Sequence, residues 1–168
     1  MIETPQQYTQ RILHFVEGGD PIALQAATGE RLEQLTAGVS AVDLRRRPAA
    51  DRWSVSEIVA HLAEAEIVIG YRLRLILGSP GAPIVAYDQD RWLTSGHYDR
   101  RDPRAAVALF RVLRDANLAL LESLDAEQWA EYGVHSERGR ESIEEIVRMT
   151  AGHDLNHVRQ IEQILVSA

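Results

Sequence analysis

The sequence of 168 residues contains no cysteine, and this absence removes several classes of protein at once. Disulfide bonds, cysteine-rich metal sites and a cysteine nucleophile are excluded, so any bound metal must use nitrogen and oxygen ligands. Long apolar runs are missing too, since no segment approaches the roughly 18 residues needed to span a membrane. The first residues have neither the basic start nor the apolar stretch of a signal peptide. We therefore expect a soluble, cytoplasmic protein.

Concentrated positive charge is also missing. The formal net charge is -7 at pH 7, and the 18 basic residues are interspersed among 25 acidic ones. A surface that binds nucleic acid needs a sustained basic patch, so we expect neither nucleic acid nor a membrane as a partner. A hydrophobic content of 45% is enough for one globular domain with its own core. We predict a single domain over residues 1–168, with its core from about residue 21 to residue 166.

Alternating strand patterns are scarce, and P-I-V-A-Y at 83–87 is the one short candidate. Helix start signals are frequent instead. Proline follows a capping residue at 4–5, 20–21 and 102–103, and capping boxes occupy 54–57 and 142–145. Helical periodicity of apolar residues follows each signal. The pattern predicts an all-α fold of four long helices, namely a four-helix bundle with an N-terminal helical extension and a long connection over 78–102 between the second and third helices.

The last predicted helix carries two histidines on its apolar face. Stepping about 100° per residue places His153, Asp154 and His157 in the sector of the apolar positions, which are Ile143, Ile146, Val147, Ile161, Ile164 and Leu165. Such imidazoles can be neutral core residues that bond to neighbouring groups. The spacing of two histidines alone does not decide between a structural and a metal-binding role.

A third histidine favours a metal site. His61 lies on the flank of the apolar stripe of the helix predicted over 55–78, turned toward a neighbouring helix. A histidine pair four residues apart and one histidine from another helix can present three nitrogens to one ion, and three protein ligands with an open position are typical of catalytic metal sites. The other histidines, which are His14, His97 and His135, are explained by a helix surface or a loop, and we assign them no role.

Two stretches resemble the DinB/YfiT-like superfamily. They are RPAADRWSVSEIVAHLAEAE at 47–66 and GRESIEEIVRMTAGHDLNHVRQIEQI at 139–164, and the resemblance extends over nearly the whole chain. Its most specific parts are Trp53-Ser54 followed by E-I-V-A-H-L, and Gly139 followed by the acidic helix start and H-D-L-N-H. The resemblance implies an up-down-down-up four-helix bundle. It also implies a divalent metal, often zinc or nickel, bound by His61, His153 and His157.

The resemblance leaves more than one function open. Some members of this superfamily use low-molecular-weight thiols such as bacillithiol or mycothiol, and others are described as hydrolases. We therefore expect a metal-dependent enzyme with a small-molecule substrate, in which the ion activates water or stabilises the thiolate of a cosubstrate. Without cysteine, the chain cannot supply that thiol itself. The alternative is a non-catalytic bundle that binds a metal or a ligand.

Several residues near the predicted ligands have two interpretations. Asp154 could orient a ligating imidazole or pair with a buried arginine, and Glu64 lies one turn from His61. Glu57 is explained as the capping partner of Ser54. The sequence therefore does not identify a catalytic residue among Asp154, Glu64 and Glu57.

The aromatic residues of the long connection are the pocket candidates, because a loop of that length in a compact domain is usually functional or mobile. They are Tyr87, Trp92 and Tyr98, and they match the variable pocket-lining segment of the family loosely. Trp53 is expected to pack at the start of its helix. Apolar residues on more than one side of the 55–78 helix, Val59, Val68 and Leu75, suggest surface beyond one core, so we expect a homodimer.

Other catalytic motifs fit less well. H-D-L-N-H resembles the H-E-x-x-H of zincins, but its carboxylate is one methylene shorter, few residues follow it, and no accompanying sheet is predicted. A ferritin-like di-iron centre needs two Glu-x-x-His pairs, whereas this chain offers only Asp154-x-x-His157. The sequence contains no G-x-S-x-G, G-x-G-x-x-G or P-loop motif.

Overall fold

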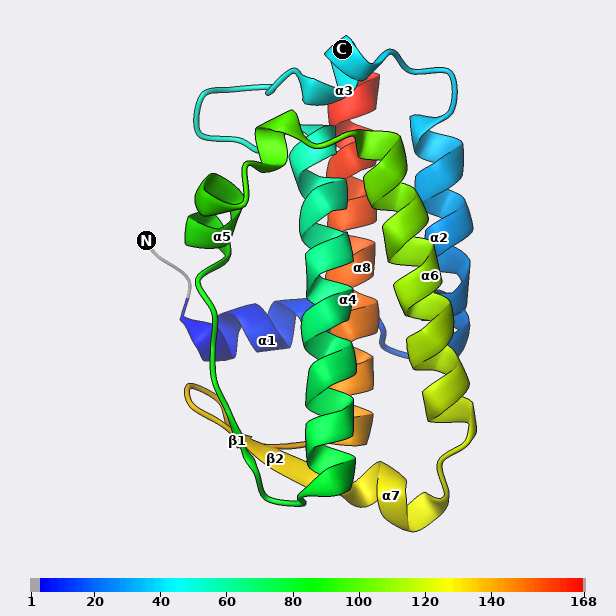
Figure 1. Cartoon of the computed structure of the whole chain (residues 1–168), viewed down its shortest axis with the longest axis vertical. Helices are drawn as coiled ribbons and strands as arrows, with labels where there is room; N and C mark the ends of the chain where they lie inside the picture. The colour runs from blue at the N-terminus through cyan, green and yellow to red at the C-terminus, as the bar shows by residue number, and fades with distance from the viewer. Residues whose placement is uncertain (1–3, 168) are drawn as a thin grey trace.

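In the computed structural model of the protein, which describes residues 4–167 apart from the side chain of Pro5, four long helices form a bundle (Figure 1). These helices are α2 (Pro21–Thr36), α4 (Val55–Gly78), α6 (Pro103–Glu122) and α8 (Ile143–Val166). In Figure 1, α2 runs upward, α4 and α6 run downward, and α8 runs upward. The predicted up-down-down-up bundle is confirmed. The shorter α1 (Pro5–His14) is the N-terminal extension and packs against α8.

The long helices begin where the sequence signals place them. Ser54 and Glu57 form a capping box at α4, and Ser142 and Glu145 form another at α8. Asp20 accepts from the backbone N–H of Ile22 at 2.9 Å and so caps α2. These caps satisfy N–H groups that a helix start leaves unpaired. Among the described residues, no helix is both long enough and apolar enough to cross a membrane.

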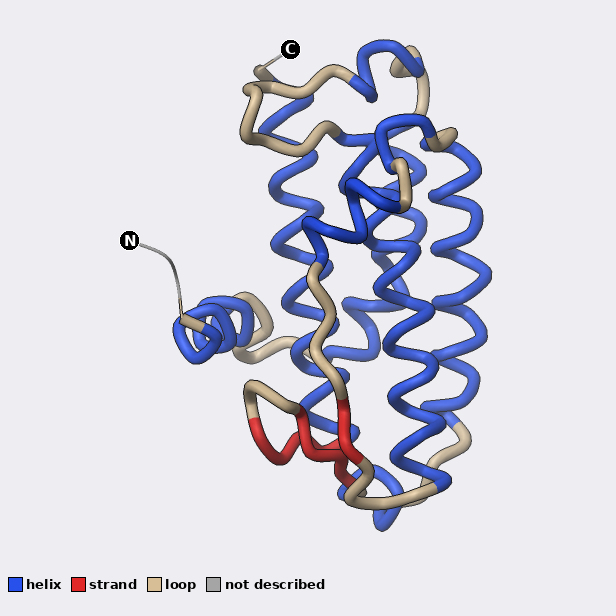
Figure 2. The backbone as a smooth tube through the Cα atoms, turned by 60° about the vertical axis from the view of Figure 1, so that its left-hand side comes forward, coloured by secondary structure: helices blue, strands red, loops and turns tan. Residues whose placement is uncertain are grey.

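The connection between α4 and α6 has to span the whole bundle. Because both helices run in the same direction, the chain must return along α4, whose 24 residues measure about 36 Å. The connection contains short elements: β1 (Pro83–Ile84), α5 (Gln89–Ser95) and the 3₁₀ helix η1 (Tyr98–Arg100). Figure 2 shows this segment rising along one side of the bundle. It therefore forms a wall beside α4.

A small sheet covers one end of the bundle. β1 pairs in parallel with β2 (Tyr132–His135), and β2 pairs antiparallel with β3 (Gly139–Ser142). The sequence patterns missed β2 and β3, and they also missed the short helices α3 (Ala41–Arg45) and α7 (Ala126–Ala130). Each has only four or five residues, and the hairpin of β2 and β3 is largely polar, so no periodic apolar signal develops.

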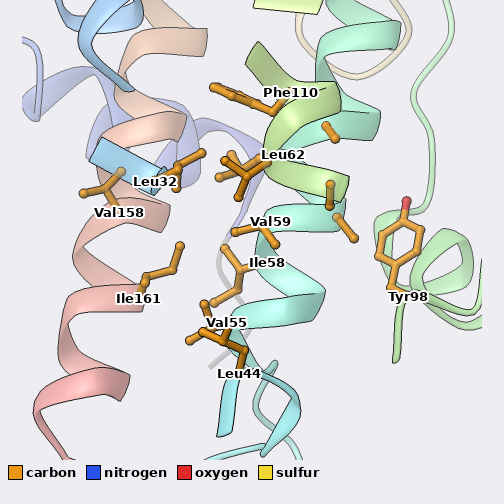
Figure 3. Packing of buried hydrophobic residues seen from close by; sticks show 14 of the residues in the cluster. Leu32, Leu44, Val55, Ile58, Val59, Leu62, Tyr98, Phe110, Val158 and Ile161 are labelled. Atoms are coloured by element: carbon orange, nitrogen blue, oxygen red, sulfur yellow. The ribbon is translucent and has the colours of Figure 1, made fainter. Parts of the chain in front are cut away.

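The apolar core has two parts separated by a buried polar layer. The first part packs Leu32, Ile58, Phe110 and Ile161 with their neighbours (Figure 3). The second part lies toward the sheet and includes Leu73, Leu121, Ile143 and Val147. Between them along the helices lie buried polar side chains, which are Gln25, Glu66, Arg114, Asn117 and Asp154. This layer contacts the site described below.

The reasoning that led us to expect a homodimer needs correction. Val59 is fully buried in the chain's own core, and Val68 and Leu75 are half-buried. The exposed apolar side chains on α4 are instead Ile67, at 47% exposure, and Tyr71, at 65%. The homodimer remains a prediction, and these two residues are its better basis.

Candidate metal centre

Three histidines from two helices meet inside the bundle. His61 comes from α4, and His153 and His157 lie one turn apart on α8. Their candidate ligand atoms all lie within 4.8 Å of one another. Nε2 of His61 is 2.9 Å from Nε2 of His153, and the ring centroids of His61 and His157 are 5.0 Å apart. All three residues predicted as ligands thus face one point.

The imidazoles are held in their neutral form. Burial lowers the pKa of His61 to about 3 and that of His157 to about 4. Burial, with the two neighbouring histidines, places the pKa of His153 well below its ordinary value. A histidine binds a metal through a deprotonated ring nitrogen, so neutral rings at pH 7 are ready ligands.

Two residues outside the histidine set control how the rings lie. Nδ1 of His157 is 3.0 Å from Oε1 of Gln160. Because an amide oxygen only accepts, Nδ1 carries the proton, which leaves Nε2 unprotonated and able to bind an ion. Trp53 stacks parallel to His157 at 6.2 Å and meets the edge of His61 at 5.1 Å. From the sequence we expected Trp53 at the helix start but not these ring contacts. Gln160 was not predicted, although its i+3 spacing from His157 was the available signal.

Asp154 forms an ion pair with a buried arginine, Arg114. Its Oδ2 accepts from Nη1 of Arg114 at 2.7 Å and from the hydroxyl of Thr28 at 3.3 Å. Its other oxygen is 4.0 Å from Nδ1 of His153, beyond hydrogen-bond distance. Burial raises the pKa of Asp154 to about 6 against the opposing effect of Arg114, so the group is ionised at pH 7. The geometry therefore matches the expected pairing of Asp154 with a buried arginine, rather than a role in orienting a ligating imidazole.

The other carboxylates near the histidines are paired as well. Glu66 binds Nη2 of Arg114 at 2.8 Å and also accepts from Asn117. Glu64, expected close to the site, pairs with Arg101. Glu57 pairs with Arg47 and caps α4. The histidines therefore offer a donor set of three nitrogens, which is a set that Zn²⁺ and Ni²⁺ accept readily.

A cavity of about 430 Å³ opens next to the histidines, and His153 forms part of its wall. Its lining includes apolar residues, which are Ala65, Val68, Ile69, Ile146 and Met149, and polar ones, which include Arg72, His135, Arg138 and Glu141. Such a mixed lining is typical of sites for small molecules. The cavity gives a ligand access to the histidine cluster.

The three aromatic pocket candidates occupy two places. Tyr87 lines the 430 Å³ cavity. Trp92 and Tyr98 instead line a smaller hollow of about 260 Å³ together with Glu64 and Arg101. The rings of Tyr87 and Trp92 are in contact, with centroids 4.6 Å apart, so they link the two hollows.

His135 was assigned to a surface or a loop, and this was wrong. It lies on β2, is buried, and lines the cavity. Its Nδ1 accepts from the backbone N–H of Glu137 at 3.2 Å. The error follows from the missed hairpin, because the two strands carry His135 inward. His14 and His97 are exposed, as expected.

The fold and the site define a class of protein: a four-helix bundle whose second and fourth long helices bring three histidines together beside a cavity. The chain belongs to the DinB superfamily, because a profile of that family matches residues 24–161. The matched region contains all three histidines.

Known relatives support the same family. A protein from Halalkalibacterium halodurans named "Putative metal-dependent hydrolase BH0277" is 22% identical over 136 residues, which is 81% of this chain and 79% of that protein. A protein of the same description from Oceanobacillus iheyensis is 23% identical and covers 79% of this chain and 76% of its own length.

Solved structures share the fold. The structure of YfiT from Bacillus subtilis, described as a four-helix bundle of unusual topology, superposes with a TM-score of 0.80 at 20% identity, covering 96% of this chain and 87% of that one. A mycothiol-dependent maleylpyruvate isomerase superposes with a TM-score of 0.67 at 11% identity, covering 82% of this chain and 57% of that one.

Proposed function

We propose that His61, His153 and His157 together bind one divalent metal ion, zinc or nickel, and that the loaded protein is an enzyme acting on a small molecule in the 430 Å³ cavity. The observation that carries this proposal is the convergence of three neutral imidazoles, two buried and one partly buried, from two helices on one point beside that cavity. A structural zinc site normally recruits a fourth protein ligand, whereas the nearby carboxylates here are all bound to arginines.

The first candidate reaction is hydrolysis. A metal ion in such a site acts as a Lewis acid and makes water acidic enough to attack at neutral pH. The chain itself would orient the ligands through Gln160 and Trp53 and would hold the substrate against the wall that includes His153. The description of two curated relatives as metal-dependent hydrolases supports this candidate.

The second candidate is transfer or isomerisation with a low-molecular-weight thiol. The shared fold with a mycothiol-dependent isomerase supports it. Because this chain has no cysteine, the thiol would have to enter the cavity as a cosubstrate. The two candidates need the same histidines and differ in their dependence on added thiol.

Metal binding is tested first, on protein purified without a histidine tag or chelator. Elemental analysis should find about one zinc or nickel ion per chain. Each of the variants His61→Ala, His153→Ala and His157→Ala should lose most of the metal binding. Variants that combine these changes should lose little more metal, because the first change already dismantles the site. His14→Ala and His97→Ala, which change exposed residues, are the controls. Full metal content in His157→Ala protein would refute the proposal.

The reaction is tested next. Metal-loaded and metal-free proteins are compared on a panel of esters and amides, and on electrophiles with and without added thiol. Turnover that needs metal but no thiol supports the hydrolase, and turnover that needs both supports the transferase. Metal binding without turnover on either panel would favour a non-catalytic binding bundle.

A further inference from the structure

The wall of the 430 Å³ cavity contains an arginine that the histidine site does not use. Arg72 is on α4, eleven residues after His61, so it lies on the same side of that helix about 16 Å along its axis. Only 8% of Arg72 is exposed. A guanidinium at this depth is normally paired with a carboxylate, because removing an isolated charge from water is costly.

Arg72 has no such partner. Over residues 4–167, its one hydrogen bond runs from Nη2 to the backbone oxygen of Val85 at 3.1 Å, and it forms no ion pair. Its guanidinium also lies 6.0 Å from the ring centroid of Tyr87. Burial, followed by the nearby charge of Arg138, lowers the pKa of Arg72. A guanidinium can donate five N–H groups, so most of this donor capacity is unused by the protein.

Among the described residues, the acidic groups of the same cavity form no ion pair with Arg72, and the charge of Glu141 acts on it only from a distance. Glu66 is bound to Arg114, and Glu141 is bound by Nη2 of Arg138 at 2.9 Å. Asp88 is exposed and caps α5 by accepting from the backbone of Arg91. Glu137 is exposed on the turn between β2 and β3. Within residues 4–167, Arg72 is therefore a cation of this cavity wall that no carboxylate contacts.

We propose that Arg72 binds a carboxylate group of the molecule that enters the cavity and thereby makes the site specific for small organic acids. A planar guanidinium can bind the two oxygens of a carboxylate side by side, and such charge-assisted bonds are strong where water is partly excluded. The apolar wall contacts the body of the acid. On the proposed function, on which this inference rests, the far end of the acid faces His153 and the metal site.

The test uses two probes of nearly equal shape. These are 4-fluorophenylacetate and its neutral analogue 4-fluorophenylacetamide, titrated against the metal-free protein and followed by ¹⁹F NMR. Without metal, a carboxylate cannot bind to the ion, so a preference for the acid reports on the cavity wall. The zinc-loaded protein is measured in parallel.

The wild-type protein should bind the acid at least tenfold more tightly than the amide. Arg72→Met should reduce binding of the acid at least tenfold and leave binding of the amide unchanged. Arg72→Lys keeps the charge without the bidentate geometry and should retain part of the preference. The matched control is Arg74→Met, two residues further along α4, since Arg74 is exposed and bonds to Gly70 and Asn117 away from the cavity. Arg74→Met protein should bind the acid and the amide with the same affinities as the wild type.

Two results would overturn the inference: equal affinity of the wild type for acid and amide, which needs no variant, or unchanged binding of the acid in folded Arg72→Met protein. Zinc content of the same samples separates this inference from the proposed function. If Arg72→Met protein binds a full equivalent of zinc and has lost the acid preference, only the specificity is changed. If wild-type protein prefers the acid and binds no zinc, the metal proposal fails alone.

Discussion

Nη1 of Arg114 lies 2.7 Å from Oδ2 of Asp154, the residue that directly follows His153. The same guanidinium binds Glu66 through Nε and Nη2 and the backbone oxygen of Gln25 through Nη1. One buried cation on α6 thus ties together α2, α4 and α8 next to the histidine cluster. The arrangement fixes the turn of α8 that presents two of the three histidines.

Arg114→Met should destabilise the protein by about 3–5 kcal/mol, because it leaves two buried carboxylates without their partner. Equilibrium unfolding in urea at pH 7 measures the change. Arg111→Met is the control, since Arg111 lies three residues earlier on α6 and pairs with Glu33 at the surface. A loss as small as that of the control would mean that the buried network contributes little to the fold.

Gln160→Leu should weaken metal binding about tenfold or more without unfolding the protein, because it removes the acceptor that fixes the ring of His157. Competition with a chromophoric chelator measures the affinity. Gln163→Leu changes an exposed residue of the same helix and should leave the affinity unchanged. Equal affinities for the two variants would show that Gln160 has no positioning role.

The stability of the metal-free protein should decrease as the pH falls from about 6.5 toward 4. The folded state lowers the pKa of His61 to about 3 and of His157 to about 4, and that of His153 also lies well below 6.5. In this window the unfolded chain binds more protons, so each histidine contributes a loss of at most about 1.4 kcal/mol per pH unit.

Asp154 opposes part of this loss. Because burial raises its pKa to about 6, the folded state binds that proton more readily between pH 6 and 4. Urea midpoints at pH 7 and pH 5 measure the net effect, which should favour pH 7. A protein with His61 and His157 both changed to Ala should have a flatter profile. An unchanged slope in that variant would assign the acid sensitivity to other groups.

Gly152→Ala should be destabilising although alanine usually favours helices. A Cβ at this position would lie 2.3 Å from the backbone oxygen of Ile12, so α1 could not remain in place against α8. The expected loss is about 1–3 kcal/mol, with faster hydrogen exchange in α1. Gly78→Ala has open space around it and should be neutral or slightly stabilising. If both variants are equally stable, α1 is not held by this close approach.

The protein should form a homodimer at micromolar concentration through the exposed apolar side of α4. Ile67 and Tyr71 lie one turn apart there, and Tyr71 is 65% exposed. Tyr71→Glu should shift the protein to a monomer. Sedimentation of the wild type as a single species near 18.8 kDa would reject the dimer.

The sequence predicted the long helices and the shared face of His153 and His157 because both depend on local rules, whereas the convergence of His61 with that pair was implied by the family resemblance. Capping residues such as Ser54 and Ser142 mark helix starts, and an i,i+4 pair shares a helix face. The cavity could not be predicted in the same way. His135 faces it only because β2 pairs with both β1 and β3, and those pairings depend on contacts between distant segments with little periodicity of their own.

The partners of the buried arginines could not be predicted from the sequence either. Arg114 and Arg72 both lie on helices, yet one meets two carboxylates and the other meets none. Helical spacing says which side of its own helix an arginine occupies. It does not say which residues of the other helices lie opposite, because that depends on the relative shift of the packed helices.

The position of α1 has a practical effect on metal measurements. Thr4 and Tyr8 line the cavity, so the start of α1 lies at the wall of the site. The other end of the chain leaves from the top of α8, at the end of the bundle away from the sheet (Figure 1). Because His157 lies only nine residues before the end of α8, a polyhistidine tag at either end would add imidazoles that compete with His61, His153 and His157 for the same ion.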